Sequence, residues 1–295
     1  MKPAPFDYLA PTTLPDAIAL LEQHGDEARA LAGGQSLVPM MAARLARPTV
    51  IIDLNRILGL SGIVVDRGAV RIGAMTRQAE ALASPALGAA LPLLAQALAE
   101  VGHPATRARG TIGGSLAHAD PAAELPAVML ALEAVLTISG PSGERRVPAE
   151  GFFLGAFETA VQTGELLTEI HLPAASSEGQ AFLEIARRKG DFAVISAAVR
   201  LGFAEDGRCS VARIVLGGVA GAPVRCRESE ERLLGERPSA GLLAAVAERI
   251  PASSIDLHSH HASRDYRRRA APVLVRRALS LAVARVAGGP RAAAP

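Results

Sequence analysis

Two short segments that each contain a pair of adjacent glycines restrict the possible folds and ligands of this chain more than any other feature. They are residues 32–37 (AGGQSL) and residues 111–116 (TIGGSL). Paired glycines reach positive φ and carry no Cβ, so backbone N–H groups in such turns can converge on an anion at close range. One turn suits one phosphate, and two turns from distant segments suit a pyrophosphate held from both sides. The alternative is two ordinary tight turns, because a short glycine motif taken alone is a weak indication.

The residues around the two turns argue against the commoner nucleotide-binding loops. Neither turn is followed by the Gly-Lys-Ser/Thr of a P-loop, and no strand–GxGxxG–helix unit of the nicotinamide dinucleotide fold is present. A helix predicted to begin at Leu37 adds unpaired N–H donors and a partial positive charge to the first turn. Ser36 can either cap that helix or donate to a phosphate oxygen.

The order of the predicted elements divides the chain into two parts. The first part mixes helices at 14–24, 37–45 and 76–101 (broken near Pro85 and Pro92) with strands at 49–54, 63–65 and 69–72 and a loop at 102–114. A stretch of small and polar residues at 174–179 is the predicted linker. Beyond it come strands at 181–186, 193–203 and 211–219, then helices at 229–234, 240–249 and 263–286. Strands followed by helices are typical of an α+β domain with a small antiparallel sheet.

The size and charge of the chain argue against several classes of protein. At 295 residues it accommodates about two domains. The 31 Lys and Arg against 29 Asp and Glu, with only 3% aromatic residues, do not indicate nucleic-acid binding. No apolar run approaches the ~20 residues that span a bilayer, and none follows Lys2 as in a secretory signal, so we expect no membrane span and a cytoplasmic location. Two cysteines, Cys209 and Cys226, cannot form a four-cysteine iron–sulfur site.

Three further segments complete a set of motifs whose order and spacing are those of a known family. They are residues 119–126 (ADPAAELP), 187–193 (RRKGDFA) and 262–268 (ASRDYRR). Together with the two double-glycine turns, they resemble the medium, FAD-binding subunit of molybdenum hydroxylases of the carbon monoxide dehydrogenase and xanthine dehydrogenase kind. The resemblance covers nearly the whole chain, and the motifs are specific in combination.

The resemblance implies an α+β fold with two domains. The first, residues 1–175, is an FAD-binding domain of the vanillyl-alcohol-oxidase and CO-dehydrogenase flavoprotein type, with subdomains at about 1–57 and 58–175. The second, residues 176–288, is a smaller domain with a three-stranded antiparallel sheet and helices. Residues 289–295 are expected to form a disordered tail.

FAD is the cofactor that the resemblance implies, and neither metal ligands nor catalytic side chains are expected in this chain. In the family the two double-glycine turns hold the FAD pyrophosphate. Gln35 stands where many relatives carry His, and either side chain can hydrogen-bond a phosphate or ribityl oxygen. Carried over to this sequence, the pyrophosphate-binding residues are Ala32, Gly33, Gly34, Gln35, Ser36, Leu37, Thr111, Ile112, Gly113, Gly114 and Ser115.

Five residues outside the turns are implied at the other end of the cofactor. Glu124 is expected to contact the ribityl chain or the flavin ring. Asp120 could contact the ligand or equally cap a turn, and Val101 and Leu167 could line the isoalloxazine or simply belong to the core. Lys189 could lie beside the ring or belong to a solvated strand end.

The implied activity is electron transfer within an oxidoreductase of several subunits. Substrate would be oxidised at a molybdopterin site on a large subunit, and electrons would reach this FAD through [2Fe–2S] centres of a small subunit before passing to an external acceptor. The implied assembly is a dimer of such heterotrimers. Two alternatives remain open: a stand-alone FAD-dependent oxidase or reductase, which would need its own substrate pocket, and a flavin-free assembly module.

Two clusters of polar residues have simpler explanations than a further site. Residues 258–261 (HSHH) could suggest a metal site, but no second Cys or His cluster lies nearby in sequence, and a loop before the last helix is preferred. The arginine-rich run 264–269, with Arg276 and Arg277, is expected to form a solvated or subunit-facing stripe on that helix. RNA binding is a weak alternative for the same stripe.

Overall fold

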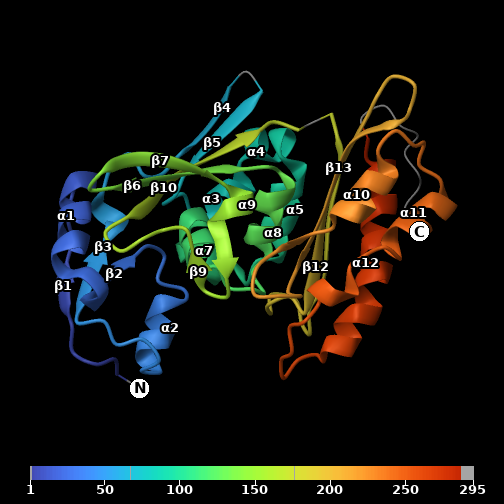
Figure 1. Cartoon of the computed structure of the whole chain (residues 1–295). Helices are drawn as coiled ribbons and strands as arrows, with labels where there is room; N and C mark the ends of the chain where they lie inside the picture. The colour runs from blue at the N-terminus through green and yellow to red at the C-terminus, as the bar shows by residue number, and fades with distance from the viewer. Residues whose placement is uncertain (1, 67, 176, 287–295) are drawn as a thin grey trace.

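The computed structural model describes residues 2–66, 68–175 and 177–286. Figure 1 shows three units side by side: an N-terminal unit in blue, a central unit in cyan to green, and a C-terminal unit in yellow to red. Each unit is built around a sheet of its own. The predicted α+β fold is confirmed: the central and C-terminal units are antiparallel sheets accompanied by helices, and only the small N-terminal unit alternates parallel strands with helices.

The N-terminal unit is a parallel three-stranded sheet with one long helix. Thr13 caps the helix by accepting from Asp16 N, which confirms the predicted helix start. Because β2 and β3 are parallel, their carboxyl ends lie at the same end of the sheet. The first double-glycine turn, which follows β2, therefore lies beside the residues after Asp53. The strands are β1 (Asp7–Leu9), β2 (Ala28–Leu31) and β3 (Val50–Asp53), in the order β1-β3-β2, and the helices are α1 (Leu14–His24) and α2 (Leu37–Ala42).

The central unit is a five-stranded antiparallel sheet accompanied by short helices. The strands, in the order β4-β5-β10-β6-β7, are β4 (Ile63–Asp66), β5 (Ala69–Gly73), β6 (Val135–Gly140), β7 (Gly143–Pro148) and β10 (Leu166–Pro173). The helices are α3 (Gln78–Ala83), α4 (Pro85–Ala90), α5 (Pro92–Glu100), α6 (Pro104–Arg109), α7 (Ile112–His118), α8 (Glu124–Ala131) and α9 (Ala149–Phe152). A small hairpin of β8 (Phe153–Gly155) and β9 (Glu158–Thr159) follows α9.

Proline positions explain why the helices of the central unit are short. Pro85, Pro92 and Pro104 each lie at the first position of a helix, where the missing N–H would have no partner in the helix anyway. The predicted breaks near Pro85 and Pro92 are therefore confirmed. The predicted loop at 102–114 is wrong, because Pro104 begins α6 and Thr111 caps α7.

The C-terminal unit is an antiparallel sheet backed by helices. Its strands β11 (Gly179–Ile185), β12 (Ile195–Phe203) and β13 (Cys209–Gly217) match the three predicted strands, and the two-residue strand β14 (Val224–Arg225) extends the sheet beyond β13. The predicted linker at 174–179 falls at the passage from β10 to β11. The helices are α10 (Arg227–Leu233), α11 (Ala240–Ala247) and α12 (Arg264–Ala284).

Both faces of the C-terminal sheet are buried, which joins this unit to the central one. Val199 and Leu201 on one face of β12 pack in the core that α12 completes, whereas Ala198 on the other face belongs to the core of the central unit. A strand buried on both faces has a nearly continuous apolar sequence rather than an alternating one. Figure 1 shows β12 and β13 between α8 and α12.

Arg200 is a charged residue on the inner face of this sheet, where it is 7% exposed. Its guanidinium donates to both carboxyl oxygens of Glu178 and, at 3.0 Å, to Glu133 Oε2 just beyond α8. Breaking such a buried pair would leave an uncompensated charge in the interior. Glu133 therefore holds β12 against the end of α8, and Glu178 holds it at the start of β11.

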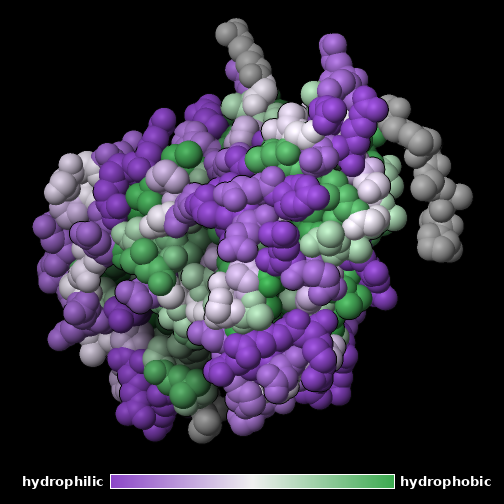
Figure 2. Space-filling model, turned by 45° about the vertical axis from the view of Figure 1, so that its right-hand side comes forward, coloured by the Kyte–Doolittle hydropathy of each residue, from purple (hydrophilic) through white to green (hydrophobic). Residues whose placement is uncertain are grey.

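The outer surface of α12 carries Arg276 and Arg277 close to the partly exposed Leu281. Figure 2 shows that hydrophilic and hydrophobic residues are intermixed over the face of the molecule that it presents. None of the helices in the described part of the chain has the length and apolar character needed to cross a membrane. The expected tail at 289–295 lies outside the described residues.

Candidate cofactor-binding site

The two double-glycine segments, far apart in sequence, are in direct contact. A Cβ on Gly33 would lie 2.4 Å from Arg109 O and 2.8 Å from Gly110 Cα, and a Cβ on Gly114 would lie 3.4 Å from the Cβ of Ala32. Contacts below 3 Å are sterically forbidden, so the backbones can approach this closely only because position 33 has no side chain. The lack of a side chain at Gly33 therefore allows the chain that leads into the second segment to pack directly on the first segment.

The first segment presents a run of backbone donors without partners. The N–H groups of residues 33–37 donate no hydrogen bond to any described residue. Gly34 has φ +74°, a conformation that turns successive N–H groups toward one side. Of the two roles open to Ser36, the structure does not show the cap, since its side chain makes no capping bond to α2, and the hydroxyl is left available to a ligand. This segment can therefore bind an anion through its amides.

The second segment is built differently, and the expectation that both turns offer free N–H groups is wrong for it. Ile112 N donates to Thr76 O at 3.0 Å and Gly113 N donates to Ala74 O at 2.8 Å. Gly114 N donates to the capping Oγ1 of Thr111 at 3.0 Å. The segment after β5 and the Thr111 hydroxyl accept from these amides, so the second turn faces the first with the α-carbon of Gly114 and offers no free N–H there.

A chain of side-chain hydrogen bonds, not foreseen from the sequence, crosses the contact between the two segments. Asn55 Nδ2 donates to Ala32 O at 3.0 Å, and Arg77 donates to Asn55 Oδ1 and to Arg109 O. The only sequence signal is that Asn55 follows a strand of a parallel sheet, at the edge where ligands bind in such sheets.

Four carboxyl groups, those of Glu100, Asp120, Glu124 and Glu184, gather where the central and C-terminal units meet. Glu124, the first residue of α8, is 3% exposed, and burial raises its pKa to about 8, with Glu184, Asp120 and Glu100 adding to the effect. Burial, followed by the charge of Glu100, raises the pKa of Glu184 to about 7. Glu124 is therefore mostly neutral at pH 7 and can donate a hydrogen bond as well as accept one.

Two polar atoms beside these carboxyls have no partner. Glu184 Oε2 and Ser196 Oγ are buried without a hydrogen-bond partner among the described residues. They lie on one face of the sheet, because Glu184 pairs with Ser196 across β11 and β12. Buried polar atoms are rarely left unpaired, so this interface fits a polar ligand.

We expect the stability of the apo-chain to fall as the pH rises. In the unfolded chain both glutamates have pKa values near the reference of 4.5, so between that pH and about 8 the folded state binds more protons than the unfolded state. The free energy of unfolding should decline over this window, by on the order of 2–4 kcal/mol for Glu124. Denaturant titrations of the apo-chain from pH 5 to about 8.5 would measure the decline.

The variant Glu124→Gln should flatten this pH dependence, because the amide cannot ionise. The exposed Glu22 on α1 provides a matched control, and Glu22→Gln should leave the slope as it is in the parent chain. An unchanged slope in Glu124→Gln would contradict the prediction.

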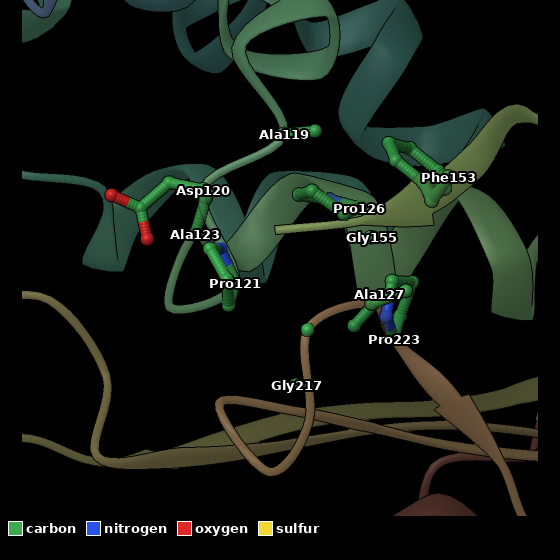
Figure 3. A pocket seen from close by; sticks show the side chains of 12 residues that line it. Ala119, Asp120, Pro121, Ala123, Pro126, Ala127, Phe153, Gly155, Gly217 and Pro223 are labelled. Atoms are coloured by element: carbon green, nitrogen blue, oxygen red, sulfur yellow. The ribbon is translucent and has the colours of Figure 1, made fainter. Parts of the chain in front are cut away.

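The loop between α7 and α8 lies against the C-terminal unit. Figure 3 shows a pocket there, lined mainly by small residues that include Ala119, Pro121 and Gly217, with the Asp120 side chain pointing away from the others. Gly218 N donates to Pro121 O at 2.9 Å. Asp120 Oδ1 accepts from Ala122 N at 2.9 Å, which is the turn-capping role that the sequence left open.

Of the remaining predicted residues, Val101 and Lys189 lie near the end of α5, and Leu167 lies on β10. Val101 and Leu167 are buried, 9% and 7% exposed, in the core of the central unit. Lys189 is exposed in the turn after β11. That turn touches the loop after Val101, because a Cβ on Gly190 would lie 2.6 Å from His103 Cε1. The structure brings Val101 and the Lys189 turn together and places Leu167 within the core.

Arg267 corrects the predicted arginine stripe on α12. It is 2% exposed, and the guanidinium donates to the carbonyl oxygens of Val194 at 3.0 Å and Gly218 at 2.8 Å. Three further bonds reach Leu257 O, Ala262 O and Ser259 Oγ. Arg267 therefore fixes the loop that contacts Pro121, whereas the expectation for a solvated residue holds for its exposed neighbour Arg269.

The described residues contain no group of three or more His, Cys, Asp or Glu side chains arranged to hold a metal ion.

Two family models match consecutive parts of the chain. The model described as the FAD binding domain in molybdopterin dehydrogenase matches residues 4–175. The model described as the CO dehydrogenase flavoprotein C-terminal domain matches residues 180–282.

Curated relatives and solved structures agree with these matches. The chain is 40% identical to the 6-hydroxypseudooxynicotine dehydrogenase complex subunit alpha of Paenarthrobacter nicotinovorans over 97% of both chains. It is 40% identical to the carbon monoxide dehydrogenase medium chain of Hydrogenophaga pseudoflava over 97% of this chain and 100% of that one. A solved carbon monoxide dehydrogenase from the same organism superposes with a TM-score of 0.93 at 40% identity, covering 97% of this chain and 100% of the other. Quinoline 2-oxidoreductase from Pseudomonas putida 86 superposes with a TM-score of 0.90 at 36% identity and the same coverage.

Proposed function

Because this chain belongs to the FAD-binding medium subunits of the molybdenum hydroxylases, the family of carbon monoxide dehydrogenase and xanthine dehydrogenase, we propose that it transfers electrons from a partner subunit to an external acceptor. FAD is its cofactor, and the chain is a flavoprotein subunit of an oxidoreductase. Bound FAD supplies one- and two-electron redox chemistry, while the protein binds and orients it. The electrons are proposed to arrive from [2Fe–2S] clusters of a small subunit, after substrate oxidation at a molybdopterin site of a large subunit.

The observation that carries the proposal is the contact between the two double-glycine segments. The free N–H groups of residues 33–37 fit the oxygens of a diphosphate. Across from them, Gly114 faces Ala32 without a side chain, so a ligand can lie close to the backbone there, whereas Gly113 packs against Ala74. We propose that the FAD pyrophosphate lies between them, contacted by residues 32–37 and 111–115.

The ribityl chain and the flavin ring are proposed to extend toward the junction of the central and C-terminal units. Glu124, with its pKa of about 8, can donate a hydrogen bond to a ribityl oxygen or accept one from a hydroxyl. The contact between the Val101 loop and the Lys189 turn supports a shared place for these two residues beside the ring. Asp120 and Leu167 are proposed as more distant members of the same site.

The proposed assembly is a dimer of heterotrimers, each with a molybdopterin-binding large subunit and a [2Fe–2S] small subunit. Relatives named as medium chains or as subunits of a complex support partners of this kind. Cys209 and Cys226 are buried, and burial raises their pKa values to about 11 and about 12, so they are poor ligands for a cluster. Free thiols also fit a reducing compartment, which supports the proposed cytoplasmic location.

The domain limits are proposed on the same basis. An FAD-binding domain is proposed for residues 1–175, with subdomains at about 1–57 and 58–175, and a C-terminal domain for residues 176–288. The family matches at 4–175 and 180–282 support this division.

An absorbance spectrum of the chain, purified alone and with its native partners, tests the proposal. We expect flavin bands with FAD released on denaturation, and iron–sulfur absorption only when the partners are present. Flavin-dependent turnover by the isolated chain on a substrate of its own would favour a stand-alone oxidase or reductase. A colourless chain that cannot be reconstituted with FAD would overturn the proposal in favour of a flavin-free module.

A further inference from the structure

A hydrogen-bonded pair of side chains, Asn55 and Arg77, spans the contact between the two double-glycine segments. We infer that this pair preorganises the diphosphate site by holding the carbonyl groups of Ala32 and Arg109, which leaves the amides of residues 33–37 to face the ligand. The inference rests on the proposed function, because it assigns positioning residues to the site where the FAD pyrophosphate is placed. Neither residue belongs to the double-glycine motifs themselves.

The pair is anchored on two different units of the fold. Asn55 lies in the short turn Leu54–Arg56 after β3, and its backbone N–H donates to Asp53 Oδ1 at 2.9 Å. Arg77 immediately precedes α3 in the central unit and forms an isolated β-bridge with Thr111. The Asn55–Arg77 hydrogen bond therefore joins the end of β3 to the chain that leads into the second segment.

The orientation of the Asn55 amide is fixed by its partners. Its Nδ2 donates to Ala32 O and to Asp53 Oδ1, and its Oδ1 accepts from Arg77. Asp53 is itself held by a hydrogen bond from the Tyr8 hydroxyl. An amide with donors and an acceptor all engaged in this way has one favourable orientation, so the Nδ2 group is directed at the first segment.

The two carbonyl groups explain why such a pair affects anion binding. A carbonyl oxygen carries partial negative charge and repels a diphosphate, so an anion site requires that nearby carbonyls be bonded or turned away. Ala32 O is bonded by Asn55, and Arg109 O is bonded by Arg77. Arg109 O is also the atom that a Cβ on Gly33 would meet most closely. When these two carbonyl oxygens are held in place, the N–H groups of residues 33–37 are held facing the opposite side, where the ligand would lie.

The charge at this contact also suits an anion. Burial and the neighbouring Arg109 lower the pKa of Arg77, although Asp53 and Glu80 act in the opposite direction. The Arg109 side chain makes no hydrogen bond or ion pair with the described residues. Two guanidinium groups thus lie close together, one of them unpaired, and a diphosphate would relieve their mutual repulsion.

The test compares Arg77→Met with Arg71→Met in the full-length, deflavinated chain. Arg71 is an exposed arginine on β5, 3.7 Å from Glu169, and replacing it removes the same charge away from the glycine segments. We expect the FAD dissociation constant to rise about tenfold or more in Arg77→Met and to change less than about twofold in Arg71→Met. Binding of FMN, which lacks the second phosphate, should be less affected than binding of FAD.

Two further readouts separate positioning of the diphosphate from general stability. The phosphorus resonances of bound FAD should shift in Arg77→Met and in Asn55→Ala, while the thermal midpoints of the apo-chains stay close to that of Arg71→Met. Arg77→Lys should restore only part of the affinity, because an ammonium group lacks the planar geometry that engages both acceptors. Parental FAD affinity and phosphorus shifts in both Arg77→Met and Asn55→Ala would overturn the inference, whereas a parent chain that binds no FAD would overturn the proposed function as well.

Discussion

Replacing Gly33 with alanine is expected to remove FAD from the chain. The new Cβ would lie 2.4 Å from Arg109 O and 2.8 Å from Gly110 Cα. Both atoms belong to the backbone, so they cannot rotate aside, and the two segments would have to separate. Forced overpacking of this kind costs about 1–3 kcal/mol, which corresponds to a loss of FAD affinity of up to roughly 100-fold if it falls wholly on the bound state. The flavin-to-protein ratio after purification and an equilibrium titration of the apo-chain would measure the loss.

Gly241 in α11 offers a matched control for this substitution. No atom lies within 4 Å of the place where its Cβ would be, and its φ is not positive. Gly241→Ala should keep FAD and, because alanine favours helix over glycine, stabilise the chain by up to about 1 kcal/mol. A Gly33→Ala chain that retains stoichiometric FAD would show that the contact between the two segments is not required for binding.

Replacing Arg267 with methionine is expected to cause the largest loss of folding stability among these substitutions. Methionine fills a similar volume but cannot donate, so the carbonyl oxygens of Val194 and Gly218 would be left buried without their partner. Three other acceptors lose a donor at the same time. Loss of a buried charged hydrogen-bond donor of this kind costs about 3–5 kcal/mol. Denaturant unfolding of the apo-chain would measure the difference in unfolding free energy.

Arg269 is the control for Arg267, because it lies two residues further along α12 with its side chain exposed. Arg269→Met should change the unfolding free energy by no more than about 0.5 kcal/mol. In the flavin-loaded chain, Arg267→Met should also perturb the flavin spectrum, since the loop that Arg267 fixes contacts Pro121 beside Glu124. Equal unfolding free energies for the two variants would contradict the interpretation of Arg267 as a buried anchor.

Local sequence signals predicted much of the secondary structure. The helix α1 begins at Leu14 as expected, and Pro85 and Pro92 begin helices where breaks were predicted. The three long strands of the C-terminal unit were also foreseen, because apolar and β-branched runs bounded by turn residues are typical of strands. The error at 102–114 came from the same source, since Pro104 begins a helix as readily as it interrupts one.

The site was predicted less completely, because hydrogen-bond partners come from elsewhere in the chain. Both glycine pairs were expected to offer free amides, yet in the second pair Gly113 N donates to the carbonyl of Ala74 after β5 and Gly114 N donates to the hydroxyl of Thr111. The arginine run was expected to be solvated, but Arg267 is buried because α12 packs on β11 and β12 with this residue directed at the carbonyls of Val194 and Gly218. Asn55 and Arg77 carry no motif, and they matter only because parallel strands place the end of β3 beside the first turn.

The sequence by itself determined that this chain is an FAD-binding member of a known family, because the two glycine pairs and the motifs that follow them occur in the order and spacing of that family. It also determined most helices and strands, which depend on local propensity and hydrophobic periodicity. Only the tertiary structure decided which turn presents free donors, which carboxyls are neutral and which arginine is buried. Those properties depend on burial and on partners brought together from distant segments, and no local pattern encodes them.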